Sequence, residues 1–151
     1  MAEKRNTKQK QVIYSVIKEL KSHPTAQQLH QILVERGYNI GASTVYRVLA
    51  DAVDDGIIMN VFSFDKNEHF DGNPVPHYHI ICTKCGRIFD SHVPYDPEID
   101  ERGRLADEDF IISSHNLEYV GICPECQKSQ IDTGMLNRIM PKEINKVAQP
   151  Q

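Results

Sequence analysis

The stretch HYHIICTKCG (residues 77–86) places two histidines and two cysteines within nine residues. Both side-chain types bind metal ions in proteins. A metal site ties distant segments of a chain together, so the number of sites formed here bears on the whole fold. The answer depends on the other cysteines and on the acidic residues that follow.

A second Cys-x-x-Cys motif, CPEC, occupies residues 123–126. Each such motif places two thiolates on one edge of a tetrahedron, and four thiolates make a closed structural zinc site. Disulfides are not expected, because we predict a cytoplasmic protein. Two unrelated buried pairs, an iron–sulfur cluster and a redox dithiol are alternatives, but the identical spacings favour zinc. The predicted structural Zn²⁺ ligands are Cys82, Cys85, Cys123 and Cys126.

The histidines then remain for a second site. Residues two apart in a strand point the same way, so His77 and His79 share a face. If Cys82 opposes Cys85 in a hairpin, His77 opposes Asp90. Two imidazoles and one carboxylate make a nitrogen and oxygen site that suits iron, manganese or zinc. We therefore predict two sites, one of sulfur only and one of nitrogen and oxygen.

Upstream of the linker, apolar residues recur at helical spacing. Thr25 and Gln28 form a capping-box pair at the start of the second helical segment. Ser43 is the expected N-cap of the third, in which Thr44 and Arg47 face outward. The predicted helices cover about residues 7–21, 25–36 and 43–55.

The segments IIMNVFSF (57–64) and EHFD (68–71), separated by a polar turn, predict a β-hairpin. Three helices followed by a hairpin are the layout of a winged helix, whose third helix reads the major groove of DNA. Helix order alone also fits other small α+β domains.

The segment GNPVP, with two prolines and a glycine, predicts a linker after the hairpin. The predicted fold class of the whole chain is α+β, and a second domain with strands and helices follows the linker. Its predicted elements are strands over 77–82 and 87–93, a helix near 97–108, a long strand over 110–123 and a helix after CPEC. The predicted divisions are a DNA-binding domain (1–72), a hinge (73–76), a dimerisation and metal-binding domain (77–140) and a flexible tail (141–151).

Charge is uneven along the 151 residues, whose net charge is −4. Residues 1–56 hold eight basic and six acidic residues, and the remainder holds nine and fifteen. A more basic first half suits a DNA-contacting domain. No apolar run approaches the length of a membrane span, and the polar N-terminus does not resemble a secretory signal, so we expect a cytoplasmic protein.

Taken together, these motifs resemble the Fur family of bacterial metal-dependent transcription regulators. The resemblance covers nearly the whole chain, and its carriers are HPTAQQLH, STVYRVL, HFD, HYHIICTKCG, RIFD and CPEC. It implies a winged-helix DNA-binding domain, a hinge and an α/β dimerisation domain. It also implies a homodimer that binds a palindromic site in double-stranded DNA, with Ser43, Thr44, Tyr46 and Arg47 in the reading helix.

Within that family, the ligand pattern is most similar to the peroxide-sensing, PerR-like branch. The resemblance implies a regulatory Fe²⁺ or Mn²⁺ site made by His23, Asp71, His77, His79 and Asp90. The iron-uptake branch typically carries glutamate where this chain has Asp71, whereas Arg47 is more similar to that branch. His115 lies where the family often has a ligand of a second regulatory site. No metal role is expected for His30, His69 and His92.

The function implied is a repressor that senses peroxide when bound ferrous iron causes oxidation of His23 or His77, with manganese as the unreactive alternative. A regulator of iron uptake or of another metal is the second interpretation. A metal-dependent enzyme is the third, although no nucleophile and base pair is apparent.

Overall fold

The structure is a computed structural model that describes residues 7–129. Within this range, residues up to Gly121 form one compact unit and those from Ile122 belong to a second. The expectations for residues 130–140, for the flexible tail at 141–151 and for the first six residues lie outside the described residues.

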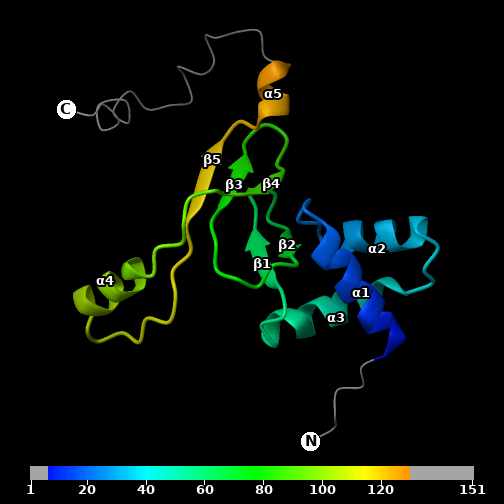
Figure 1. The fold of residues 1–151 in the computed structure, drawn as a ribbon, viewed down its shortest axis with the longest axis horizontal. Coiled ribbons are helices and arrows are strands. Elements are labelled where there is room, and N and C mark those ends of the chain that lie inside the picture. The colour runs from blue at the N-terminus through cyan, green and yellow to red at the C-terminus, as the bar shows by residue number, and fades with distance from the viewer. Residues whose placement is uncertain (1–6, 130–151) are drawn as a thin grey trace, which may run out of the picture. The chain divides into compact units, whose positions relative to one another are not determined.

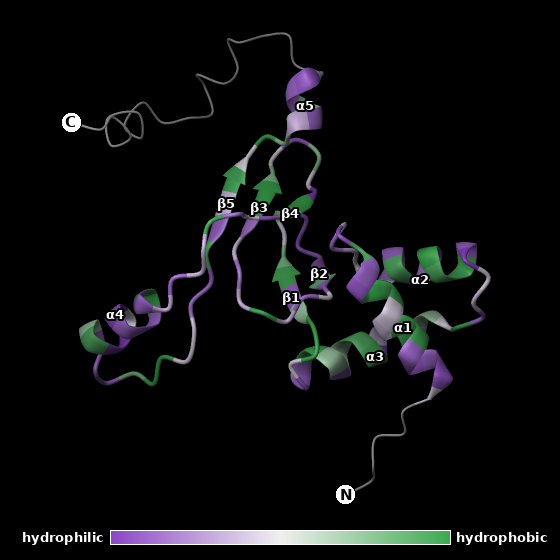
Figure 2. Cartoon of the chain, in the orientation of Figure 1, coloured by the Kyte–Doolittle hydropathy of each residue, from purple (hydrophilic) through white to green (hydrophobic). Residues whose placement is uncertain are grey.

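Three helices open the first unit: α1 (Lys8–Glu19), α2 (Ala26–Glu35) and α3 (Ala42–Asp54) (Figure 1). Each alternates hydrophobic and hydrophilic residues along its length (Figure 2). Their apolar faces meet in one core, and each fully buried aliphatic side chain contributes about 1.5–3 kcal/mol. Fully buried members of this core include Ile13, Ile17, Leu29, Leu33, Val45 and Leu49.

The start of α2 confirms the predicted capping box. The Thr25 hydroxyl accepts from the Gln28 N–H at 3.2 Å, and the Gln28 side chain accepts from the Thr25 N–H at 2.9 Å. The predicted cap of α3 is wrong, because Gly41 is its N-cap and Ser43 lies inside the first turn. The Val45 N–H already donates to the Gly41 carbonyl at 3.1 Å, so the chain is helical before Ser43.

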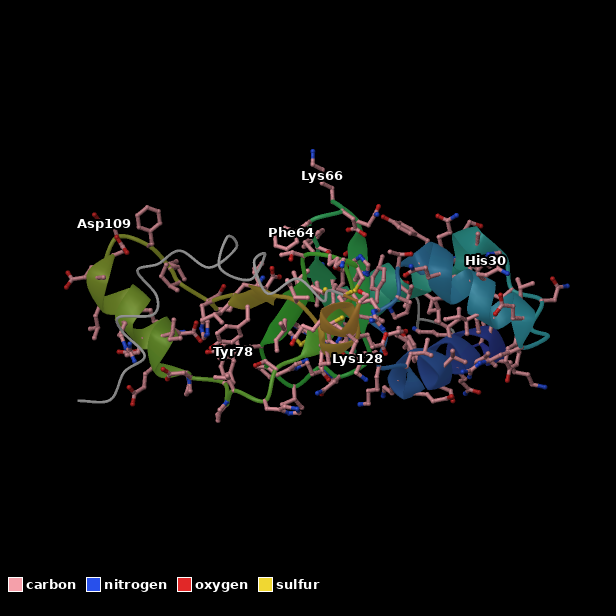
Figure 3. All side chains as sticks on the ribbon, turned by 90° about the horizontal axis from the view of Figure 1, so that it is seen from above. His30, Phe64, Lys66, Tyr78, Asp109 and Lys128 are labelled. Atoms are coloured by element: carbon pink, nitrogen blue, oxygen red, sulfur yellow. The ribbon has the colours of Figure 1, made fainter. Side chains whose placement is uncertain are left out.

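The hairpin consists of β1 (Met59–Phe62) and β2 (Glu68–Asp71), paired antiparallel. Phe70 of β2 joins the helical core, and its N–H donates to the Pro24 carbonyl at 2.9 Å. At the turn between the strands, Lys66 extends away from the helices and strands (Figure 3). Helices and hairpin together confirm the predicted winged helix.

Immediately after β2 the backbone passes close to α1. A Cβ atom on Gly72 would lie 2.5 Å from the Ile17 carbonyl oxygen, closer than real Cβ contacts come. Only glycine fits there without a shift of the backbone. Gly72 therefore sets where the chain leaves the winged helix, one residue after Asp71.

A three-stranded sheet follows, in the order β4-β3-β5. It is built from β3 (His79–Cys82), β4 (Ile88–Asp90) and β5 (Glu118–Gly121), with α4 (Glu98–Ala106) between β4 and β5 in the sequence. β4 pairs antiparallel with β3, and β5 pairs parallel with it. A winged helix followed by this sheet gives the predicted α+β class.

The long strand predicted over 110–123 is wrong in its length, because residues 111–117 lie outside any strand. The Arg104 side chain of α4 donates to the Ile112 carbonyl at 3.0 Å, and Ile112 packs on Gly103. This segment therefore bonds to α4 before the strand begins at Glu118.

The predicted register of the β3–β4 hairpin is also wrong, since His79 and not His77 opposes Asp90. The Cys82 N–H donates to the Arg87 carbonyl at 2.9 Å, so Cys82 pairs with Arg87 instead of Cys85. Gly86, with φ of 73°, supplies the left-handed residue of this longer turn. The shift is two residues, which leaves every side chain on its predicted face.

The second unit begins with Ile122 and contains the short helix α5 (Pro124–Lys128). Cys123 is its N-cap and Pro124 its first residue, where a missing N–H costs nothing. Among the helices of residues 7–129, none is long and apolar enough to cross a membrane.

Candidate metal centre

Five metal-ligating side chains of the first unit converge from separate segments. His23 precedes α2, Asp71 ends β2, His77 precedes β3, His79 begins β3 and Asp90 ends β4. One ligand atom from each lies within 4.8 Å of the ligand atoms of the other four. The structure thus brings together all five residues that the resemblance to the family implied as ligands of one metal ion.

The distances fit a coordination shell. Oδ2 of Asp71 lies 3.3, 2.8 and 3.1 Å from the Nε2 atoms of His23, His77 and His79. Oδ1 of Asp90 lies 2.8, 3.2 and 3.8 Å from the same three atoms. With metal–ligand bonds of roughly 2.1 Å, neighbouring ligands at right angles stand about 3 Å apart. The residues present therefore fit a first-row divalent metal ion at their centre.

The orientation of His77 supports the same conclusion. Its Nδ1 lies 2.6 Å from the Val75 carbonyl oxygen, which can only accept, so Nδ1 carries the proton. In the neutral ring, Nε2 then presents a lone pair to the carboxylates of Asp71 and Asp90. The lone pair of Nε2 and the carboxylate oxygens repel one another, and a cation bound between them removes that repulsion. The hydrogen bond from Nδ1–H is the support that metal-binding histidines usually have.

The local electrostatics favour positive charge. Burial lowers the pKa of His23, but the carboxylates of Asp71 and Asp90 outweigh it and raise that pKa above its usual value. Burial likewise raises the pKa of Asp71, but hydrogen bonds from His23, His79 and the Asn73 N–H outweigh it and hold that pKa well below its usual range. A buried carboxylate that stays ionised among imidazoles is a strong cation ligand.

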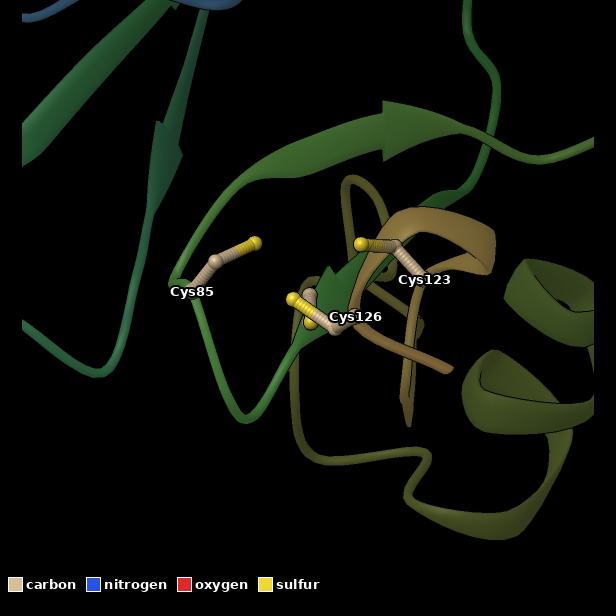
Figure 4. A group of neighbouring side chains, drawn as sticks. Cys85, Cys123 and Cys126 are labelled. Atoms are coloured by element: carbon tan, nitrogen blue, oxygen red, sulfur yellow. The ribbon is translucent and has the colours of Figure 1, made fainter. Parts of the chain in front are cut away.

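The four cysteines divide between the two units, and no disulfide joins them. Cys82, which is buried, ends β3, and Cys85 lies in the following turn, which the Gly86 N–H closes on the Cys82 carbonyl at 2.9 Å. Cys123 and Cys126 lie at the start of α5 (Figure 4). Together the two pairs offer four sulfur ligands, the set of a closed structural zinc site.

His115, the candidate for a further metal site, uses both ring nitrogens in hydrogen bonds. Its Nε2 lies 2.9 Å from the Tyr78 hydroxyl, and its Nδ1 lies 2.8 Å from Oδ1 of Asp100. The Tyr78 hydroxyl also accepts from the Asp96 N–H at 3.0 Å. Within residues 7–129, no group of three or more metal-ligating side chains contains His115. Hydrogen bonds of His115 therefore link Tyr78, the residue before β3, and Asp100 of α4 to the segment before β5.

The predicted DNA-reading residues lie on the solvent side of α3. Ser43, Tyr46 and Arg47 are exposed, and Thr44 is half-buried. A groove runs beside them, lined by Tyr46, by the start of α2 at Thr25 to Gln28 and by the wing turn at Asp65 to Glu68. Helix α3 therefore presents exposed side chains next to the wing.

His69, for which no metal role was expected, is buried in the structure and not solvated. His69 is 6% exposed, and its ring contacts the backbone of His23 and the side chain of Asp65. His69 precedes Asp71 by two residues and therefore shares a face of β2 with it, which is the signal in the sequence that could have identified it. His30 and His92 are half-buried and exposed, respectively.

This fold and site define a winged-helix protein with a group of metal ligands contributed by the winged helix and by the sheet that follows it. Residues 2–120 match the model of the family described as "Ferric uptake regulator family". The chain belongs to this family.

Individual proteins agree with this assignment. The chain is 39% identical over 126 residues to a "Peroxide-responsive repressor PerR" of Staphylococcus epidermidis, a match that covers 82% of each chain. Among solved structures it is similar to the ferric uptake regulator of Helicobacter pylori (TM-score 0.62, 25% identity, 82% of each chain). It is also similar to that of Vibrio cholerae (TM-score 0.61, 27% identity, 79% of this chain and 92% of the other).

Proposed function

We propose that this protein is a metal-dependent repressor that binds operator DNA as a homodimer and releases it when peroxide oxidises a histidine ligand of its regulatory metal. The observation that carries the proposal is the five-residue group of His23, Asp71, His77, His79 and Asp90. The 39% identity to a peroxide-responsive repressor supports the choice of signal.

The proposed regulatory ligands belong to two parts of the fold. His23 and Asp71 belong to the winged helix. His79 and Asp90 belong to the sheet that follows, and His77 precedes its strand β3. The proposed divisions, a domain over 1–72, a hinge over 73–76 and a second domain from 77, put the metal across the hinge. An ion that binds all five residues favours one orientation of the DNA-binding domain and so raises affinity for the operator.

In the proposed regulatory site, Fe²⁺ or Mn²⁺ takes the three imidazole nitrogens and two carboxylate oxygens. Ferrous iron bound there would activate peroxide toward a neighbouring imidazole, whose oxidation provides in net the two electrons that reduce the peroxide, and manganese would not. One peroxide oxygen ends on a carbon of an imidazole, and the other leaves as water. His23 and His77 are the proposed targets, because oxidation of either ring weakens its hold on the ion and releases the hinge.

The proposed structural zinc is bound by Cys82, Cys85, Cys123 and Cys126. Its role is to secure the start of α5 to the β3–β4 turn, and four thiolates leave no open position for reaction. A closed site of this kind contributes to folding and takes no part in sensing.

The proposed DNA contacts are made by the exposed side of α3. Ser43, Thr44, Tyr46 and Arg47 enter the major groove, and the dimer places two copies of α3 on the halves of a palindromic site. Arginine recognises guanine through two hydrogen bonds, which makes Arg47 the main candidate for reading sequence.

The test is mass spectrometry of the iron-loaded protein after exposure to low peroxide. One added oxygen on the peptide that carries His23 or His77, together with loss of operator binding, is the expected result. Protein loaded with Mn²⁺ serves as the matched control and should remain unmodified. If the iron-loaded protein stays on DNA with both histidines unchanged, regulation by metal level replaces peroxide sensing.

A further inference from the structure

We infer that His69 is a positioning residue that holds the regulatory ligand His23 and the turn of the β1–β2 wing in a single arrangement. The inference rests on the proposed regulatory site and adds to it a residue that is not one of its ligands.

Both ring nitrogens of His69 have partners in the protein. Nδ1 lies 2.8 Å from the backbone carbonyl oxygen of His23, and Nε2 lies 3.1 Å from Oδ2 of Asp65. The carbonyl oxygen can only accept, so Nδ1 carries a proton and donates it. The ring is buried, which excludes the water that would otherwise compete for this bond.

His23 needs this support because its backbone is unusual. Its φ angle is 50°, in the left-handed region that residues other than glycine seldom adopt. Such a conformation persists only where the surroundings hold it on several sides. Here β2 does so, through the bond from His69, the Phe70 N–H donated to the Pro24 carbonyl and a bridge between Thr25 and His69.

The consequence falls on the ring of His23. From this backbone its Nε2 reaches 2.8 Å from Oδ1 of Asp90 and 3.3 Å from Oδ2 of Asp71. A return of φ to negative values would turn the side chain away from both carboxylates. His69 thus acts on the metal through the backbone of His23 and touches none of the coordinating atoms of that side chain.

The other side of His69 faces the wing. Oδ1 of Asp65 accepts from the Asn67 N–H at 2.9 Å and closes the turn, while Oδ2 of the same carboxylate faces His69. Lys66, between them, has φ of 62°. One imidazole therefore links the wing turn to the segment that carries His23.

Two substitutions of His69 distinguish its contact with the His23 carbonyl from its contact with Asp65. In His69→Asn the amide nitrogen stands near the position of Nδ1 and keeps the donor for the His23 carbonyl. In His69→Gln it stands near Nε2 and keeps only the contact to Asp65. Asp65→Asn alters the wing side alone, and His30→Gln is the matched control for losing a histidine elsewhere in the winged helix.

The measurement is the affinity of the zinc-loaded protein for Mn²⁺ by calorimetry. His69→Gln should weaken it by about tenfold or more, the usual scale for a residue that supports a ligand. His69→Asn, Asp65→Asn and His30→Gln should bind Mn²⁺ like the unmodified protein. Equal losses in the Asn and Gln variants of His69 would indicate a merely structural role and overturn the inference, as would unchanged binding in both.

His77→Ala separates this inference from the proposed function. If His77→Ala binds Mn²⁺ as well as the unmodified protein does, the regulatory site itself is wrong. If His77→Ala loses Mn²⁺ and His69→Gln keeps it, only the role of His69 is wrong.

A second measurement tests the inference without requiring that the His69→Gln variant folds. In the unmodified zinc-loaded protein labelled with ¹⁵N-histidine, NMR should show a hydrogen on Nδ1 of His69 that is protected from exchange with water. The signal is assigned by its absence in His69→Asn. A bare Nδ1 would overturn the inference even if His69→Gln failed to fold.

Discussion

Nε2 of His77 lies 2.8 Å from Oδ2 of Asp71, although the linker of residues 72–76 separates them in the sequence. Asp71 ends the wing, and His77 precedes the first strand of the sheet. A ligand that binds both side chains therefore requires the linker between them to follow one particular path. This relationship is the reason that small changes at Asp71 and Gly72 test the proposed function most directly.

Replacing Asp71 with glutamate should keep metal-dependent DNA binding but reduce peroxide sensitivity. The Asp71 carboxylate is fixed by the Asn73 N–H at 2.8 Å and lies within 3.3 Å of three imidazoles. A side chain one carbon longer would place its carboxylate differently among these imidazoles and so would change how the residues hold the ion. Operator binding by the iron-loaded protein across a peroxide series measures the effect, with Asp96→Glu as the control. A variant as sensitive as the unmodified protein would contradict the assignment of Asp71.

Replacing Gly72 with alanine should destabilise the protein by about 1–3 kcal/mol, the usual cost of forcing an extra carbon into a packed site. The new Cβ would meet the backbone of α1 at 2.5 Å, and the strain would reach Asp71. Chemical denaturation of the zinc-loaded protein measures the change, and Mn²⁺ affinity should fall as well. Gly103→Ala is the control, since its Cβ meets only the Ile112 side chain at 3.6 Å. If Gly72→Ala were as stable as the unmodified protein, the backbone of α1 would have to shift to make room for the added carbon.

Replacing Cys126 with serine should release zinc and abolish the dimer. A structural zinc site contributes on the order of 10 kcal/mol to folding, and serine is a poor zinc ligand. Zinc content by elemental analysis and mass by light scattering are the measurements. Glu125→Gln, in the same CPEC motif, should retain zinc and dimer. A stable zinc-free dimer of Cys126→Ser would refute the four-cysteine site.

Replacing Arg47 with alanine should weaken operator binding by about 1–3 kcal/mol, the value of one arginine–guanine pair. Arg47 is exposed on α3, so its loss should leave Mn²⁺ affinity and stability unchanged. Arg36→Ala removes the same charge from the winged helix, together with the exposed ion pair that Arg36 forms with Glu19. Equal operator affinity in both variants would mean that Arg47 reads no base.

Much of the winged helix follows from local sequence. The capping box at Thr25, the helical spacing of α1 to α3 and the polar hairpin turn depend on neighbours within a few residues. The start of α3 was missed because Gly41 accepts the first helical hydrogen bonds, and glycine is a weaker capping signal than serine. The β3–β4 register was missed by two residues, yet the predicted face survived because strand side chains alternate with period two.

What the sequence by itself determined was the inventory: two Cys-x-x-Cys pairs, His77 and His79 on one face and a carboxylate at Asp90 on the same face of the paired strand. Those relations follow from the period of a strand and the geometry of a tight turn. Only the tertiary structure decided that Asp71 lies against His77 and that the ring of His69 contacts the His23 carbonyl. These contacts join residues 6 and 46 positions apart. The first depends on the path of the linker at residues 72–76 and the second on how β2 packs against the segment before α2, and no local pattern encodes either.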